Sequence, residues 1–305
     1  MSNISIIGAG PGGLAAGLML LKQGHEVHIY EKDNRVGGRS KRLIFGDFVF
    51  DSGPTFFMYQ PILREVFERS GLSFDEHIKL TKLDPLYALY FNDFSIEPSA
   101  NPNETAEMFE NISKGSGKAY LTWYKKQHTK FKKVMPILQK PFPNVFHFLR
   151  PDVLAGAPVL HPFQSVYKRL SSFFDHEDLI HTLSFQAKYL GMASFEAPSV
   201  FTILPFLEHH GGLYHVEGGL NQINEKMAEL FVSLGGQLHL NTEVKHIHVK
   251  NKQIEWIETN QGQIQTDHVV LNADFADAML RMVKPESLKR FSHEKIKHMK
   301  YSVSA

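Results

Sequence analysis

The 305-residue chain contains no cysteine. This absence excludes disulfide bonds, thiolate metal sites and a thiol nucleophile, and it fits a reducing compartment. No uninterrupted apolar run reaches the length that a bilayer requires, and no block of basic residues resembles a nucleic-acid footprint. We therefore expect neither a transmembrane span nor a nucleic-acid partner.

The composition is that of a folded globular protein. Hydrophobic residues make up 43% of the chain, charged residues 21%, and the formal net charge is +1. The length suits one large domain or two ordinary ones. An apolar strand starts at residue 4, which leaves no room for a signal or transit peptide before it, so we expect a cytoplasmic protein.

The first 31 residues combine a strand, a glycine-rich turn, a helix and a second strand. Ile4–Ile7 form a short apolar run, and the turn Gly8-Ala9-Gly10-Pro11-Gly12-Gly13 follows it directly. Leucines then recur at helical spacing from Leu14 to Leu21, and a further apolar run ends at Glu31. This order of elements is the context in which a glycine-rich turn indicates dinucleotide binding.

Each residue type in this unit meets a need of such a ligand. Gly8 permits the tight turn, Gly10 lets the backbone approach a pyrophosphate, and Gly13 lets the helix pack close to the sheet. The phosphates would face amides at the helix N-terminus, and the Glu31 carboxylate would accept hydrogen bonds from the ribose hydroxyls. The glycines do not separate FAD from NAD, but Glu31 disfavours a 2′-phosphate because two anions repel.

A second glycine-containing loop follows. In Arg35-Val36-Gly37-Gly38-Arg39, paired glycines lie between two arginines, so the backbone can approach an anion with cations beside it. Leu43–Asp51 predicts a hairpin about Gly46-Asp47. The hairpin runs into Ser52-Gly53-Pro54-Thr55, a tight turn that aromatic residues follow.

Together these segments resemble the carotenoid desaturases, which are the phytoene and dehydrosqualene desaturases within the amine-oxidase-like flavoproteins. The paired glycines and Arg39 are shared by that whole group, and Asp51-Ser52-Gly53-Pro54-Thr55 points more narrowly to the carotenoid enzymes. The resemblance spans essentially the whole chain. A further match is Asp84–Tyr87, which resembles a short strand-forming stretch of that family. The others are Phe185–Gly191, Ala197–Ser199, Gly211–Leu220, Asn241–Val244 and Leu271–Asp274.

The resemblance implies FAD as cofactor and dehydrogenation of a carotenoid precursor by hydride transfer to the flavin. It places Gly38 and Arg39 on the phosphate side, Gly53–Thr55 near the flavin ring, and the Val244 backbone at the adenine. The candidate cofactor-binding residues are Gly8, Gly10, Pro11, Gly12, Gly13, Glu31, Lys32, Gly37, Gly38, Arg39, Gly53, Pro54, Thr55 and Val244. No catalytic residue is assigned; Asp152 and Glu208 are candidate proton acceptors only.

The expected fold is α/β, with a discontinuous Rossmann-like FAD-binding domain, a helical insertion and a partial α+β substrate domain. The FAD-binding parts are residues 1–78 and 211–282, substrate-domain strands occupy 79–103, and the helical insertion occupies 104–210. Residues 283–305 would begin the return of the substrate domain. In the second FAD-binding part we expect a helix from Ile223 to Leu234 and four strands, which are 238–240, 244–249, 254–258 and 264–271.

The stretch 104–205 is expected to be mainly helical and carries many bulky side chains. Between residues 125 and 148, lysines alternate with aromatic and aliphatic residues, and Pro136, Pro141 and Pro143 are expected to break any long helix. Such a segment suits the headgroup region of an anionic leaflet, or equally a lid with a solvated lysine face. A polyene substrate dissolves in bilayer, so we favour peripheral contact with the inner face of the membrane.

The carotenoid desaturases continue well beyond residue 305, where Met299–Ala305 would start a strand. We therefore expect a fragment or split reading frame, with a second polypeptide supplying the missing half. Two other functions stay open, an amine or porphyrinogen oxidase of the same group and a non-catalytic remnant. We expect no metal site, although histidines cluster at His209, His210 and His215 and at His246 and His248.

Overall fold

The computed structural model describes residues 1–161, 163–288 and 291–299, and the chain divides into two units. The first unit contains Met1–Thr81 together with the described residues from Tyr214 onward. The second contains Lys82–Leu213. The strand predicted to start at Met299–Ala305 lies almost wholly outside the described residues.

A four-stranded parallel sheet forms the centre of the first unit. Its strands are β1 (Asn3–Ile7), β2 (Glu26–Tyr30), β10 (Gln237–His239) and β14 (His268–Leu271), in the order β10-β2-β1-β14. Ile6 pairs with Ile29 on one side and with Val270 on the other. The central strand β1 is buried from Ile4 to Ile7, and β2 is buried at Val27, Ile29 and Tyr30, which confirms the strands predicted from residues 4 and 27.

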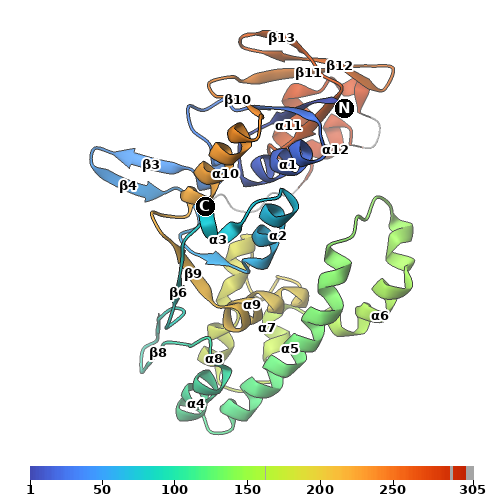
Figure 1. The fold of residues 1–305 in the computed structure, drawn as a ribbon. Coiled ribbons are helices and arrows are strands. Elements are labelled where there is room, and N and C mark those ends of the chain that lie inside the picture. Colours follow the sequence, from blue (N-terminus) through green and yellow to red (C-terminus); the bar gives the residue numbers. More distant parts are fainter. Residues whose placement is uncertain (162, 289–290, 300–305) are drawn as a thin grey trace. The chain divides into compact units, whose positions relative to one another are not determined.

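Helices pack against this sheet (Figure 1). The first, α1 (Pro11–Lys22), begins at a proline and stops short of Gly24, as its sequence predicts. It contacts α10 (Asn221–Ser233), and the core between them includes Leu14, Leu18, Met227 and Phe231. Two shorter helices, α2 (Pro61–Arg69) and α3 (Phe74–His77), add Phe67 and Phe74 to the same core.

A second, antiparallel sheet contains β11 (Val244–Lys250), β12 (Gln253–Thr259) and β13 (Gly262–Gln265). The strand predicted across 264–271 is wrong as a single element. It is divided between β13 and β14, which belong to different sheets. The Asp267 carboxylate accepts from the Asn3 amide, and the Asp267 amide donates to the Asn3 carbonyl, so the chain turns there to join β1.

The remaining elements of the first unit are short. The predicted hairpin is confirmed as β3 (Arg42–Phe45) and β4 (Phe48–Asp51), and it follows the 3₁₀ turn η1 (Gly38–Ser40). A small sheet has the order β5 (Phe57–Met58), β9 (Leu213–Val216), β6 (Leu80–Leu83). The elements that follow β14 are α11 (Phe275–Met282), η5 (Pro285–Ser287) and α12 (His293–Lys297).

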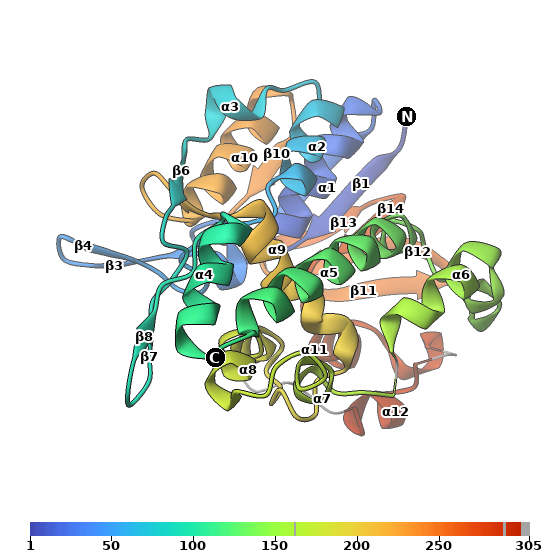
Figure 2. The same cartoon turned by 90° about the horizontal axis from the view of Figure 1, so that it is seen from below.

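The second unit is mainly helical, which confirms the character predicted for residues 104–205. The long helix α5 (Ser116–Leu138) contacts α4 (Pro102–Ile112), α6 (Pro151–Leu160) and α9 (Ile203–Gly211), and Figure 2 shows α4 and α6 near its two ends. The other elements are β7 (Leu89–Tyr90), β8 (Ser95–Ile96), η2 (Val145–Leu149), α7 (Val166–Leu170), α8 (Glu177–Thr182), η3 (Phe185–Leu190) and η4 (Ser199–Thr202).

Two local predictions in this unit are wrong. Pro136 does not break a long helix, since it lies inside α5, in the last turn before Leu138. A proline there removes only one hydrogen bond at a helix end that is already short of partners. Asp84–Tyr87 does not form a strand, because it is the irregular connection between β6 and β7.

Candidate functional site

The glycine-rich turn joins β1 to α1 at the carboxyl edge of the parallel sheet. Gly8 has a φ of +102°, and a Cβ there would lie 2.5 Å from the Asn272 carbonyl oxygen. A Cβ on Gly13 would lie 2.2 Å from the Gly8 carbonyl oxygen. The backbone therefore has the tight turn and the close packing that the sequence predicts for these two positions.

The N-terminus of α1 is open to an anion. Gly10 is its N-cap, no side chain caps it, and its first turn holds no acidic residue. The positive end of the helix dipole and the first amides are thus left to a ligand. Gly10 has a φ of −74°, so glycine is needed here for the space in front of the turn and not for the backbone conformation.

The Glu31 carboxylate ends β2 beside this turn. One of its oxygens accepts from the Ala9 amide at 2.8 Å, the other accepts from the Asp33 amide at 3.0 Å, and the residue is 6% exposed. These bonds fix the carboxylate against the turn. Each oxygen can accept a second hydrogen bond, so the ribose role of Glu31 stays a prediction that the geometry allows. Lys32 follows it and is exposed.

The second glycine loop packs directly on the first. The Gly37 amide donates to the Ala9 carbonyl at 2.9 Å, and a Cβ on Gly38 would lie 3.5 Å from the Gly10 Cα. The Arg39 guanidinium is 92% exposed and donates to Asp274 at 3.3 Å. The sequence motifs around residues 8–13 and 35–39 therefore form one surface.

The third motif, Asp51–Thr55, packs against the Gly37–Arg39 loop. Ser52 donates through its hydroxyl to the Arg39 carbonyl at 3.1 Å, and a Cβ on Gly53 would lie 2.5 Å from that same oxygen. Gly53, Pro54 and Thr55 are exposed beside the loop. Val244, which is predicted to meet the adenine, is the first residue of β11 and is buried. Two residues before it, the Thr242 amide donates to the Glu31 carbonyl at 2.8 Å.

Two residues of this site were not predicted from the sequence. Asn272 follows β14, and its side-chain amide donates to the Gly8 carbonyl at 3.2 Å, inside the turn. Asp51 accepts from the Leu220 and Asn221 amides at 2.9 and 3.2 Å, so it holds the N-terminus of α10. The signal for Asn272 was its place after a strand that pairs with β1, because neighbouring parallel strands end at one sheet edge.

These residues fit an adenine dinucleotide. An uncapped helix N-terminus suits the pyrophosphate, the buried Glu31 acceptor suits the ribose, and the Gly37–Arg39 loop lines the same edge. All the predicted cofactor residues lie in the first unit.

Neither candidate proton acceptor belongs to this unit. Asp152 lies in the first turn of α6 in the second unit and pairs with Lys140 and Arg150 at 2.8 and 2.7 Å. Hydrogen bonds from those two cations hold the pKa of Asp152 well below its usual range. A carboxylate paired in this way is a weak base.

Glu208 is buried in the second unit within a network of polar side chains. Its carboxyl accepts from Gln186 at 2.8 Å and from the Tyr189 hydroxyl at 3.0 Å. Burial raises its pKa to about 7. The neighbouring His209 contacts the hydroxyls of Tyr87 and Tyr120, each at 2.8 Å, and burial lowers its pKa to about 3.

One histidine of each cluster stacks on an aromatic ring. The ring of His248 stacks on Trp256 with 3.4 Å between centroids, and the ring of His210 stacks on Phe206 at 4.9 Å. No group of three or more histidine, aspartate or glutamate side chains able to hold a metal occurs among residues 1–161, 163–288 and 291–299. Within those ranges, no helix is both long enough and apolar enough to cross a membrane.

Comparison with known proteins gives relatives along the whole chain. A 4,4′-diapophytoene desaturase (4,4′-diapolycopene-forming) of Methylomonas is 36% identical over 304 residues, which cover 99% of this chain and 59% of the relative. A 4,4′-diapophytoene desaturase (4,4′-diaponeurosporene-forming) of Staphylococcus aureus is 30% identical and covers 99% and 61%. The chain thus spans about three-fifths of the length of these relatives.

Solved structures share the fold. An oxidoreductase from Methanosarcina mazei superimposes with a TM-score of 0.64 at 22% identity, over 94% of this chain and 62% of that one. A putrescine oxidase does so with 0.64 at 18% identity, over 97% and 63%. Residues 11–305 match the family described as flavin containing amine oxidoreductase. With the dinucleotide cradle and this match over nearly its whole length, the chain belongs to the flavin-containing amine oxidoreductase family, whose cofactor here is FAD.

Proposed function

We propose that this chain acts in the FAD-dependent desaturation of a carotenoid precursor of the phytoene or dehydrosqualene type. The observation that carries the proposal is the 36% identity with a diapophytoene desaturase over 99% of the chain. The glycine turn, Glu31 and the Gly37–Arg39 loop supply the cofactor side of such an enzyme.

The residues of the first unit have a positioning task in this chemistry. When bound, oxidised FAD supplies an acceptor for the hydride that leaves an allylic carbon, and loss of a proton from the adjacent carbon completes the double bond. The turn before α1 would hold the pyrophosphate, and Glu31 would hold the ribose through its remaining lone pairs. Gly53–Thr55 would face the ring system, where small or rigid residues allow close approach.

A bacterial host that accumulates dehydrosqualene tests this function. We expect the extracted carotenoids to gain conjugation, seen as new visible absorption bands, when the chain is expressed. The Gly211→Ala variant should give the same carotenoids as the wild type, because a Cβ there meets nothing within 4 Å. If the FAD-loaded protein leaves dehydrosqualene and phytoene unchanged but oxidises an amine or a porphyrinogen, the proposal is wrong.

We further propose that the second unit contacts the membrane in which such a substrate dissolves. Exposed apolar side chains gather between the end of α5 and the start of α7, where Phe146 is 73% and Phe163 98% exposed. Val145, Phe148, Leu149 and Leu154 are exposed as well, and lysines flank them on α5. Apolar side chains beside cations suit the boundary between acyl chains and anionic headgroups. That a second polypeptide completes the flavin site stays a prediction.

A further inference from the structure

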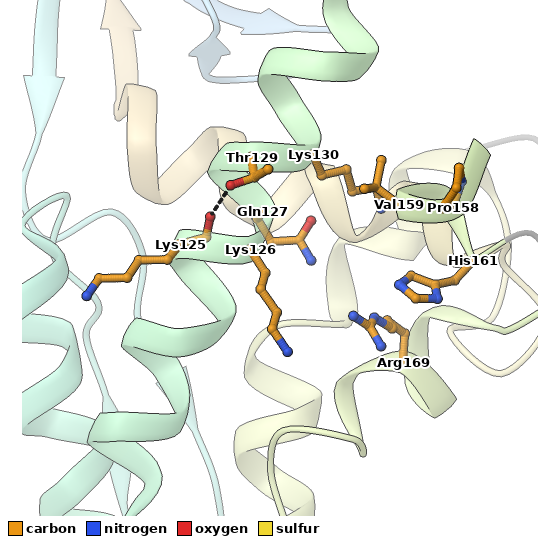
Figure 3. Close-up of a pocket in the computed structure, with 9 residues that line it drawn as sticks. All are labelled: Lys125, Lys126, Gln127, Thr129, Lys130, Pro158, Val159, His161 and Arg169. Carbon is orange, nitrogen blue, oxygen red and sulfur yellow. Dashed lines mark hydrogen bonds between the residues drawn. The ribbon is translucent and has the colours of Figure 1, made fainter. Parts of the chain in front are cut away.

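A basic cavity of about 550 Å³ lies inside the second unit, between α5, the end of α6 and α7. Four of the residues that line it are lysine or arginine, His161 is a fifth basic residue, and none is acidic. Figure 3 shows Lys126, Gln127 and Arg169 extending into one space, with the His161 ring beside Arg169, while Lys125 points away.

Other contacts hold these cations in place without neutralising them. The Lys126 ammonium and the Arg169 guanidinium both lie over the ring of Phe173, at 5.1 and 4.9 Å from its centroid. The Lys130 ammonium is buried and donates to the Ser199 carbonyl and the Thr202 hydroxyl, at 2.9 and 3.0 Å. Among the described residues, none of the three cations forms an ion pair with a carboxylate.

Two basic groups at the cavity, Lys130 and His161, have pKa values below their ordinary range. Burial, with a smaller contribution from the Arg169 charge, lowers the pKa of Lys130 to about 7. Burial and the positive charges of Arg169, Lys130 and Lys126 lower the pKa of His161. Cations gathered without a carboxylate are unfavourable alone, and an anion between them would relieve both the repulsion and the desolvation.

We propose that this cavity binds a phosphate group, with Arg169 and Lys126 as its principal ligands and Lys130 and Gln127 as further donors. A guanidinium offers paired donors that match phosphate oxygens, and lysines add point charges. The cavity is large enough for a headgroup as well as a bare anion. Exposed apolar residues on the segments that line the cavity, Leu154 of α6 and Phe163 two residues after His161, make an anionic phospholipid the favoured source, and that part rests on the membrane contact proposed above.

The test compares two double variants with equal charge loss from the same two helices. Lys126→Gln with Arg169→Gln removes the two principal ligands. Lys118→Gln with Lys168→Gln removes exposed cations of α5 and α7 that lie outside both the cavity and the proposed membrane contact. Each protein is titrated with inorganic phosphate by thermal unfolding. Each is also sedimented with phosphatidylcholine vesicles that contain phosphatidic acid, or oleate as an anion without added phosphate.

We expect phosphate to raise the melting temperature of the wild type and of the control but not of the cavity variant. Binding to phosphatidic acid vesicles should fall about tenfold in the cavity variant, as expected when charge-assisted hydrogen bonds are lost, and stay within about twofold in the control. Oleate vesicles should not distinguish the two variants. If the double variant does not fold, the single variant Lys126→Gln replaces it, because Lys126 is exposed and its substitution should not disturb folding.

Equal losses in both double variants, or an unchanged phosphate response in the cavity variant, would overturn the phosphate site. A cavity-dependent phosphate response without any vesicle preference supports the site and overturns the lipid source. None of these readouts depends on flavin or on desaturation. Failure of the proposed catalytic function is therefore distinguishable from failure of this inference.

Discussion

At the scale of single residues, the glycines of the site are of two kinds. At some a Cβ would clash with the backbone, and at others it would only take up space that a ligand needs. Gly8 and Gly13 face backbone atoms at 2.5 and 2.2 Å, so any side chain there displaces the protein itself. Gly10 faces only the Asn272 amide nitrogen, at 3.2 Å, and has an ordinary φ. Its substitution therefore separates ligand binding from folding.

We expect Gly10→Ala to fold normally and to bind FAD about tenfold more weakly, a loss on the order of 1.4 kcal/mol, because its methyl group obstructs the pyrophosphate. Flavin absorbance per polypeptide after dialysis against graded FAD measures the change. Gly211→Ala is the matched control. Equal FAD affinity in Gly10→Ala and wild type would remove the turn from the cofactor site.

Glu208 predicts a pH dependence of stability. Its folded pKa of about 7 lies above the ordinary carboxyl value of 4.5, so its stabilising contribution is full below pH 4.5 and is lost as the pH rises through 7. The whole contribution is on the order of 3 kcal/mol. Glu208→Gln cannot ionise, and its amide can donate to the Gln186 carbonyl oxygen, a buried atom that lacks a hydrogen-bond partner.

Urea unfolding of wild type and Glu208→Gln, from pH 4.5 to 8, measures this effect. The variant should gain stability relative to the wild type as the pH rises. His209 contributes stability above pH 6.5 that is lost as the pH falls towards its folded pKa of about 3, but it is present in both proteins and cancels in the difference. A difference that stays constant with pH would contradict the raised pKa of Glu208.

At the scale of elements, Asp51 connects the β3–β4 hairpin to α10. Its two oxygens accept from the amides of Leu220, which precedes the helix, and of Asn221, its first residue, so a distant segment supplies the cap. We expect Asp51→Ala to destabilise the protein by about 1 to 2 kcal/mol, through loss of the cap and of its charge at the helix dipole. Urea denaturation measures the loss.

Asp47→Ala is the control for this prediction, because Asp47 is an exposed residue of the turn in the same hairpin. It should change the free energy of unfolding by less than about 0.5 kcal/mol. If both variants lose the same stability, the carboxylate of Asp51 is not what anchors α10.

At the scale of the whole molecule, each of the two units carries a pair of exposed phenylalanines that could contact a membrane. Phe146 and Phe148 belong to η2 in the second unit, and Phe45 and Phe48 belong to the hairpin of the first. We expect Phe146→Ser with Phe148→Ser to reduce binding to anionic vesicles by about a hundredfold or more, since each buried aromatic ring contributes roughly 1.5 to 3 kcal/mol and about 1.4 kcal/mol corresponds to a factor of ten. Sedimentation with vesicles measures the change.

Phe45→Ser with Phe48→Ser is the control, because these rings are similarly exposed. Vesicle binding should persist in that variant. Loss in the hairpin variant and retention in the η2 variant would move the proposed membrane contact to the first unit.

The sequence by itself determined the first βαβ segment and the hairpin of the cofactor unit, because local rules govern those parts. Hydrophobic periodicity places β1, α1 and β2, Gly24 ends the helix, and Gly46-Asp47 turns the hairpin. A resemblance carried by contiguous motifs then pointed to the flavin family. These features depend on residues close together in the chain, so they can be predicted without knowledge of the tertiary structure.

Only the tertiary structure decided how distant residues meet. It brought Asn272 into the glycine turn, placed Asp51 at the start of α10, and divided 264–271 between two sheets. It also gathered Lys126, His161 and Arg169 around one cavity and buried Glu208 among tyrosines. Hydrogen bonding and desolvation depend on distances through space, and residues far apart in the chain carry no local pattern that records those distances.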